Sequence, residues 1–71
     1  MMEKEMYAKY NRLNDRLNEL STLNTNIAKL AFYLNENKIE DADCANALQG
    51  QLDFMIKYRE ALQDRIINGY Y

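Results

Sequence analysis

One stretch near the C-terminal end repeats its apolar residues at alternating spacings of four and three. Its members are Leu48, Leu52, Met55, Arg59, Leu62 and Ile66. This rhythm places all six side chains on one stripe of an α-helix, which is the seam by which a helix packs against another helix. One member, Arg59, is charged, and its neighbour Tyr58 is amphipathic. The seam therefore turns polar and aromatic partway along, and this change marks the region as a candidate functional site.

A second helical pattern lies upstream, with apolar residues every seven positions: Met6, Leu13, Leu20, Ile27 and Leu34. A second set is interleaved with the first: Tyr10, Leu17, Asn24 and Ala31. Asn24 is the polar exception, and an asparagine in such a seam tends to fix register or oligomeric state at a cost in stability. The weak helix formers of residues 21–26 leave two alternatives, a new helix capped by Ser21 or one continuous helix. Because the seven-residue phase is not reset there, the pattern favours a continuous helix with a possible kink near Ser21.

The two patterns are joined by a short polar connection. We predict a first helix over residues 2–35, a turn over 36–41 and a second helix over 42–68, within one domain spanning 1–71. Asn35 or Asn37 is suited to a left-handed end of the first helix, Asp41 to the N-cap of the second, and Asn68-Gly69 to its stop. Gly50 falls inside the second helix, where it allows either a close helix crossing or a bend. A short connection between two long helices predicts an all-α fold, an antiparallel two-helix hairpin.

The chain has 71 residues, no proline and two glycines. A chain of this size has a small core, which rarely supplies more than about 3–5 kcal/mol below roughly 70–80 residues. Several apolar residues also fall beside or outside the two seams: Leu23, Leu30, Phe32, Phe54, Ile56 and Ile67. We therefore expect the hairpin to assemble with itself as a homo-oligomeric helical bundle.

Composition argues against several classes of function. A net charge of −2 makes duplex nucleic acid an improbable partner. No apolar run approaches the ~18–20 residues that span a bilayer, and no secretory signal is evident, so we expect no membrane association and a cytoplasmic location. With no histidine and the single cysteine Cys44, the sequence offers no disulfide, no metal site, no cofactor motif and no activated nucleophile. We expect that the chain is not an enzyme.

Tyrosines and cations gather at the open end of the predicted hairpin, where its two termini meet. Tyrosine rings stack on nucleobases and arginine forks bind phosphate oxygens in pairs. The candidate ligand-binding residues are Tyr7, Tyr10, Arg12, Tyr58, Arg59 and Arg65. Alternatives remain open: Tyr10 is also suited to a core position with its hydroxyl at the rim, and Arg12 and Arg16 are also suited to pair with neighbouring acids on a solvated face.

Part of the sequence resembles a known family. The run Gln51-Leu52-x-x-Met55-x-x-Tyr58-x-x-x-Leu62-x-x-Arg65-Ile66 follows Ile27-x-Lys29-Leu30-x-x-x-Leu34 and an acidic turn. This arrangement, over about residues 12–67, is similar to small phage proteins with the helical-hairpin domain of the anti-CBASS and anti-Thoeris cyclic-nucleotide sponges. The resemblance implies a helical homo-oligomer whose interface pockets bind immune signalling nucleotides without cleaving them. Tyr58 and Arg65 match its second-helix motif, and Tyr7 or Tyr10 with Lys9 or Arg12 stands nearest to its N-terminal aromatic–lysine pair.

Two functions of different classes follow from these observations. The first is a phage anti-defence sponge that sequesters a cyclic di- or trinucleotide in the cytoplasm of an infected bacterial host cell. The second is a structural or adaptor hairpin whose exposed seam binds a helix of another protein, since tyrosine and arginine are also enriched at protein interfaces.

Overall fold

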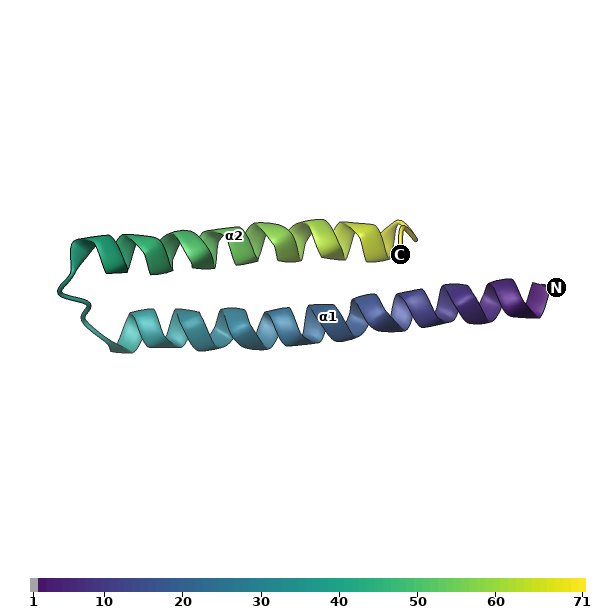
Figure 1. Ribbon diagram of the computed structural model, residues 1–71, viewed down its shortest axis with the longest axis horizontal. Helices are drawn as coiled ribbons and strands as arrows, with labels where there is room; N and C mark the ends of the chain where they lie inside the picture. The colour runs from purple at the N-terminus through teal and green to yellow at the C-terminus, as the bar shows by residue number, and fades with distance from the viewer. Residues whose placement is uncertain (1) are drawn as a thin grey trace.

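The computed structural model describes residues 2–71, and Met1 lies outside the described part. It contains two helices, α1 (Met2–Glu36) and α2 (Ala42–Ile67), which lie side by side and antiparallel (Figure 1). The predicted all-α hairpin is therefore confirmed. Its dimensions are 59 × 15 × 14 Å, those of a rod rather than a globule. Because α1 has 35 residues and α2 has 26, the N-terminal end of α1 (purple in Figure 1) extends past the end of α2.

Side-chain hydrogen bonds at both ends of the connection terminate the helices there. At the end of α1, the backbone N–H and the side-chain amide of Asn37 donate to the Tyr33 carbonyl at 3.0 and 2.9 Å. At the start of α2, the Asp41 carboxylate accepts from the backbone N–H groups of Asp43 and Cys44 at 2.9 and 3.2 Å. Asp41 is thus the N-cap. The expected left-handed end of α1 is not formed, because among residues 2–71 only Gly69 has a positive φ.

The C-terminal end of α2 closes in a Schellman motif. Gly69 has a φ of +76°, in the left-handed region that glycine adopts without steric cost. Its N–H donates to the Ile66 carbonyl at 3.2 Å, and the Tyr70 N–H donates to the Arg65 carbonyl at 2.7 Å. These two bonds satisfy carbonyls that the helix end would leave unpaired. They also turn the last residues back toward α1.

The seam of α1 differs in one respect from the predicted one. Its buried and half-buried positions are Leu13, Arg16, Glu19, Leu20, Leu23, Ile27, Leu30, Ala31 and Leu34. Of the residues interleaved at the expected spacing, Leu17 and Asn24 are exposed, so the prediction that Asn24 lies in the seam is wrong. The physical reason is that the apolar spacing of α1 allows two registers, which bury different stripes of the helix. The observed register turns Leu23 and Leu30 inward and leaves Asn24 in solvent.

The seam of α2 is the predicted one. All six positions between Leu48 and Ile66 are buried or half-buried, including Arg59. Three apolar side chains are buried in the described part of the chain: Ile27 of α1, and Leu52 and Leu62 of α2. A core of three side chains is small even for a chain of this length, as the composition indicated.

Helix α1 is continuous through residues 21–26, so a separate helix starting at Ser21 is ruled out. The Thr25 hydroxyl donates to the Ser21 carbonyl at 3.1 Å, which satisfies this polar side chain within the helix.

Helix α2 likewise runs through Gly50. A Cβ built at Gly50 meets no atom within 4 Å, so the glycine does not serve a close crossing within the chain. No helix among residues 2–71 is both long and apolar enough to cross a bilayer.

The core predicts a sharp contrast between two leucine variants. Leu62 is 0% exposed, whereas Leu17 is 45% exposed. We expect Leu62→Ala to lower the free energy of unfolding by about 2–4 kcal/mol, because it removes buried methyl groups and leaves a cavity. Leu17→Ala is the matched control and should change it by less than about 1 kcal/mol. Thermal and urea unfolding followed by far-ultraviolet circular dichroism measures both, and equal losses would contradict the assigned register.

Candidate functional site

The open end of the hairpin carries three aromatic side chains, here called the tyrosine cluster: the exposed Tyr7 and Tyr10 and the half-buried Tyr71. Tyr7 and Tyr10 lie on the part of α1 that extends past α2, and Tyr10 is 64% exposed. Two shallow hollows meet at this cluster. One, of about 610 Å³, is lined by Glu3, Met6, Tyr7, Tyr10 and Asn11, and the other, of about 270 Å³, by Met6, Lys9, Tyr10, Leu13 and Tyr71.

The C-terminal turn is what brings Tyr71 to α1. The Arg65 guanidinium Nε donates to the Tyr70 carbonyl at 3.1 Å and holds the last residues against the end of α2. Lys9 Nζ then lies 6.0 Å from the centre of the Tyr71 ring, at the limit of a cation–π contact. Residues from the two ends of the sequence therefore form one aromatic surface with a cation beside it.

Tyr58 lies in a second place, in the middle of the hairpin. Its hydroxyl donates a hydrogen bond across the helices to the Glu19 carboxylate. Arg16 Nε lies 3.1 Å from the other oxygen of the same carboxylate. This contact is an ion pair rather than a hydrogen bond, since the buried Arg16 Nε has no acceptor of suitable geometry among residues 2–71. The carboxylate of Glu19 thus joins a phenol from α2 to a cation from α1.

The same contacts change the acidity of the phenol. The hydrogen bond to Glu19, desolvation and the negative charge of Glu19 raise the pKa of Tyr58 above its ordinary value of 10.0. The positive charges of Arg65 and Arg16 act in the opposite direction. Tyr58 therefore remains a neutral hydrogen-bond donor at physiological pH.

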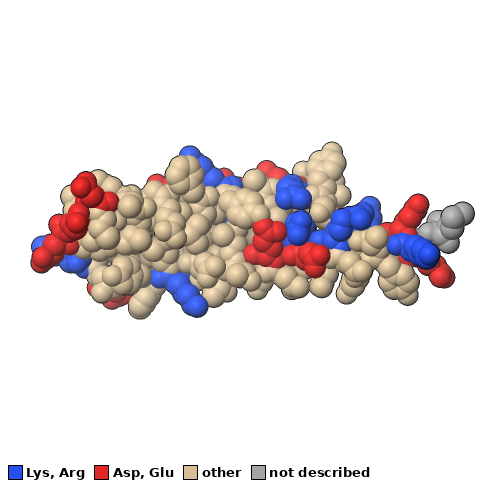
Figure 2. Space-filling model, viewed as in Figure 1, with Lys and Arg blue, Asp and Glu red and all other residues tan. Residues whose placement is uncertain are grey.

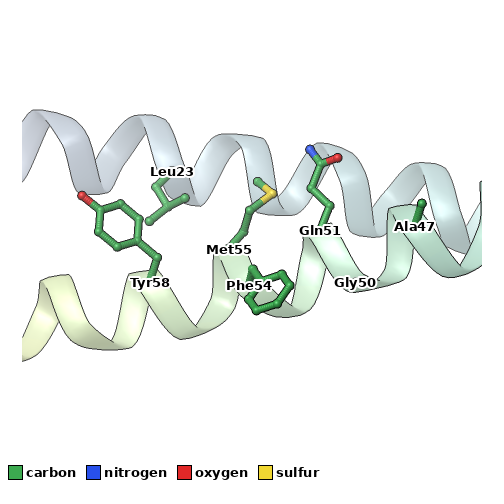
Figure 3. A pocket seen from close by; sticks show the side chains of 7 residues that line it. All are labelled: Leu23, Ala47, Gly50, Gln51, Phe54, Met55 and Tyr58. Atoms are coloured by element: carbon green, nitrogen blue, oxygen red, sulfur yellow. The ribbon is translucent and has the colours of Figure 1, made fainter.

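The Tyr58 ring forms one end of an apolar groove of about 630 Å³, here called the α2 groove. It is lined by Leu23, Ala47, Gly50, Gln51, Phe54, Met55 and Tyr58. Figure 3 shows that Leu23 enters from α1 while the other residues belong to α2, and that the Phe54 ring lies over α2 itself. None of the lining residues is charged. The groove suits an apolar partner better than an anion.

The charged side chains are spread unevenly along the hairpin, with Arg16 and Glu19 in the middle and others toward both ends. On the face seen in Figure 2, a broad uncharged area lies between the turn and the centre, and charged groups gather at the turn and toward the N-terminal end of α1. Among residues 2–71, no three or more cysteine, aspartate or glutamate side chains are grouped so that they could hold a metal ion. The cations nearest the tyrosine cluster are Lys9, which lines one of its hollows, and Arg12.

The predicted site residues fall into separate places in the single chain. Tyr7 and Tyr10 belong to the tyrosine cluster, and Arg12 is exposed on α1 just beyond it. Tyr58 contacts Glu19, which is nine residues from Tyr10, or about 14 Å along α1. The hairpin therefore does not bring Tyr58 and Tyr10 into one pocket.

The two predicted arginines of α2 have different surroundings. Arg59 lies half-buried in the seam, with no ion pair in the described part of the chain, which suits a packed aliphatic stem and a guanidinium that reaches solvent. Arg65 is exposed and is tied to the Tyr70 carbonyl. Of the two, Arg65 is nearer the tyrosine cluster, through its contact with the C-terminal turn.

Sequence reasoning missed two features of these sites. The contact between Glu19 and Tyr58 joins residues 39 positions apart, so only the register of the two helices reveals it. The sequence had indicated a pairing of Arg16 with a neighbouring acid, and this ion pair is present. The α2 groove was also missed, although Phe54 outside the seam and Gly50 inside the helix were the relevant signs.

Comparisons with known proteins give one finding that bears on function. The family described as Sequestin matches residues 2–68, which is nearly the whole chain. The same chain matches no curated protein and no solved structure.

The raised pKa of Tyr58 predicts a specific alkaline titration. Subtracting the phenolate absorbance curve of Tyr58→Phe from that of the wild type should give a midpoint above 10.0. Because the pKa is raised on folding, the stability from this hydrogen bond is complete below pH 10 and is lost as the pH rises through the raised value. Glu19→Gln keeps an acceptor but removes the charge, so it should lower the midpoint. A midpoint at or below 10.0 in the wild type would contradict the contact.

Proposed function

The chain belongs to the Sequestin family, and from this premise we propose that it binds a small nucleotide messenger and sequesters it without chemical change. The ligand proposed is a cyclic di- or trinucleotide, as the resemblance to the phage sponges implies. In this role the protein acts in the cytoplasm of an infected bacterial cell. Binding withholds the messenger from its effector, so affinity alone supplies the function and no catalytic group is required.

The observation that carries the proposal is the tyrosine cluster with its neighbouring cations. Tyr10 lines two adjoining hollows, one shared with Tyr7 and the other with Tyr71, and Lys9 lies beside the Tyr71 ring. A base stacked on an aromatic ring gains about 1–3 kcal/mol, largely independent of which base it is. Lys9 and Arg12 are suited to neutralise phosphates beside the stacked bases.

A single chain leaves this ligand surface open, and a homo-oligomer would enclose it. Tyr7, Tyr10, Tyr70 and Ile67 are exposed at or near the open end. A second copy there would remove apolar surface from water and supply further cations to the phosphates. We therefore include self-association in the proposal. It also provides a way for Arg65 of one copy to approach the tyrosine cluster of another.

The second candidate function is a protein-binding adaptor, and the α2 groove is the observation that favours it. A groove of about 630 Å³ between two helices, with an uncharged lining, is suited to the apolar face of a helix from another protein. This reading assigns no role to the tyrosine cluster or to its cations. The two functions therefore predict different ligands.

A thermal-shift screen separates the two functions. The wild type is heated with each member of a panel of cyclic di- and trinucleotides, with the matching linear nucleotides as controls. A ligand present at 100 times its dissociation constant should stabilise the protein by about 2.7 kcal/mol, which is readily measured. Stabilisation by a cyclic nucleotide supports the sponge. No shift with any nucleotide at a concentration of about 1 mM would favour the adaptor.

The stacking role of Tyr10 predicts a loss of affinity that a distant tyrosine does not share. We expect Tyr10→Ala to weaken nucleotide binding by roughly 1–3 kcal/mol. Tyr33→Ala is the matched control, because Tyr33 is also an exposed tyrosine of α1 but lies in its last turn. Isothermal titration calorimetry measures all three proteins. Equal losses in the two variants, or none in Tyr10→Ala, would show that the tyrosine cluster is not the site.

The phosphate contact is tested with Arg65→Ala. Loss of a charge-assisted hydrogen bond should cost about 1.5–3 kcal/mol, or roughly ten- to a hundredfold in affinity. Lys29→Ala is the control, since Lys29 is an exposed cation away from the open end. Wild-type binding should weaken as the salt concentration rises, and the Arg65→Ala protein should show a smaller salt dependence. Heating the complex should release the nucleotide intact, and recovery of a cleaved product would contradict sequestration.

A further inference from the structure

The α2 groove contains a projection and a recess on the same helix, one turn apart. The projection is Phe54, which is 72% exposed although it is a large apolar side chain. The recess is Gly50, where a Cβ would meet no atom within 4 Å. Both line the groove, together with the small side chain of Ala47. Among residues 2–71, a nearby group over the Phe54 ring is Lys57 Nζ, 5.9 Å from its centre.

Gly50 is unfavourable for the isolated chain. A glycine inside a helix costs about 1 kcal/mol relative to alanine, and the open space around Gly50 would accept alanine's methyl group. The hairpin itself therefore gains nothing from this glycine. The cost is offset only if another molecule packs closely against the helix at that point, where a glycine permits near approach of the partner.

The arrangement is complementary to itself. In an antiparallel pair of α2 helices related by a two-fold axis midway between residues 50 and 54, Phe54 of each copy lies opposite Gly50 of the other. A two-fold interface requires this reciprocity, in which one residue meets a second and the second meets the first. We propose that the α2 groove is the surface through which two copies of this chain pack against each other, α2 on α2.

The charges beside the groove support the same antiparallel pairing. In this register Lys57 lies opposite Ala47 of the second copy, one turn from that copy's Asp43. A lysine stem spans one helical turn, so each copy is able to offer one cation to one acid of the other. Lys57 already lies along the rim of the groove, since its Nζ is 5.9 Å from the centre of the Phe54 ring. A parallel pairing would place Lys57 beside Lys57 and Asp43 beside Asp43.

The required area is within reach of one face of the hairpin. A specific interface usually buries about 800 Å² on each partner, which is about one seventh of the 5790 Å² surface of this chain. One long face of the rod, 59 × 15 Å, is of this size. The core of the single hairpin is small, so pairing would also add to its stability.

Two variants that change opposite features of the groove test the surface. Phe54→Ala removes the projection, and Gly50→Leu fills the recess while raising helix propensity. Both should weaken self-association by at least about tenfold, because Phe54→Ala removes contacts and Gly50→Leu obstructs close approach at the centre of the interface. Phe32→Ala is the matched control: Phe32 is 67% exposed but lies on α1 outside the groove. Sedimentation equilibrium without nucleotide measures association, and circular dichroism confirms that each variant is helical.

A gain in helix stability together with a loss of association in Gly50→Leu would be specific to this interface, because a merely structural glycine would not produce both. Unchanged association in both groove variants, or a loss in Phe32→Ala alone, would overturn the proposed surface. The α2 pairing is part of the proposed homo-oligomer and is distinct from the contact at the open end. It does not depend on the ligand. A wild type that sediments as a monomer at about 100 μM would overturn both the surface and the oligomer. Nucleotide binding, measured separately by calorimetry, would still decide the sponge.

Discussion

The register in which α1 meets α2 determines the rest of this structure. The seven-residue repeat of α1 allows two seams, one through Leu23 and Leu30 and another through Leu17 and Asn24. The first is used, because it buries two leucines and leaves the asparagine in water, where its amide is solvated at no cost. The consequence is that Arg16 takes a half-buried position that an apolar residue would otherwise hold.

This half-buried arginine explains the polar contact at the middle of the hairpin. A cation partly removed from water requires a counter-charge, and Glu19 supplies it at 3.1 Å. The same carboxylate then accepts the hydroxyl of Tyr58 from α2. The Tyr58 side chain is thereby fixed with its ring along the α2 groove, and its pKa is raised. A choice of apolar register in α1 has thus positioned an aromatic side chain of α2.

The length difference between the helices separates the open end from the middle. Because α1 extends past α2, Tyr7 and Tyr10 remain exposed, and the bonds of the Schellman motif bring Tyr71 to the hollow beside Tyr10. The proposed nucleotide surface and the proposed α2 interface therefore occupy different parts of the rod. Occupation of one surface leaves the other accessible. Nucleotide affinity and oligomeric state can therefore be measured separately.

The sequence alone determined the hairpin, the α2 seam, the Asp41 cap and the stop at Gly69, because each depends on residues within a few turns of one another. It also placed Tyr7 and Tyr10 at the open end. It did not determine which of two overlapping stripes of α1 would be buried, since both satisfy the same periodicity and only packing against α2 separates them. Tertiary structure alone therefore decided that Asn24 is exposed, that Glu19 binds Tyr58, and that Phe54 stands uncovered beside Gly50.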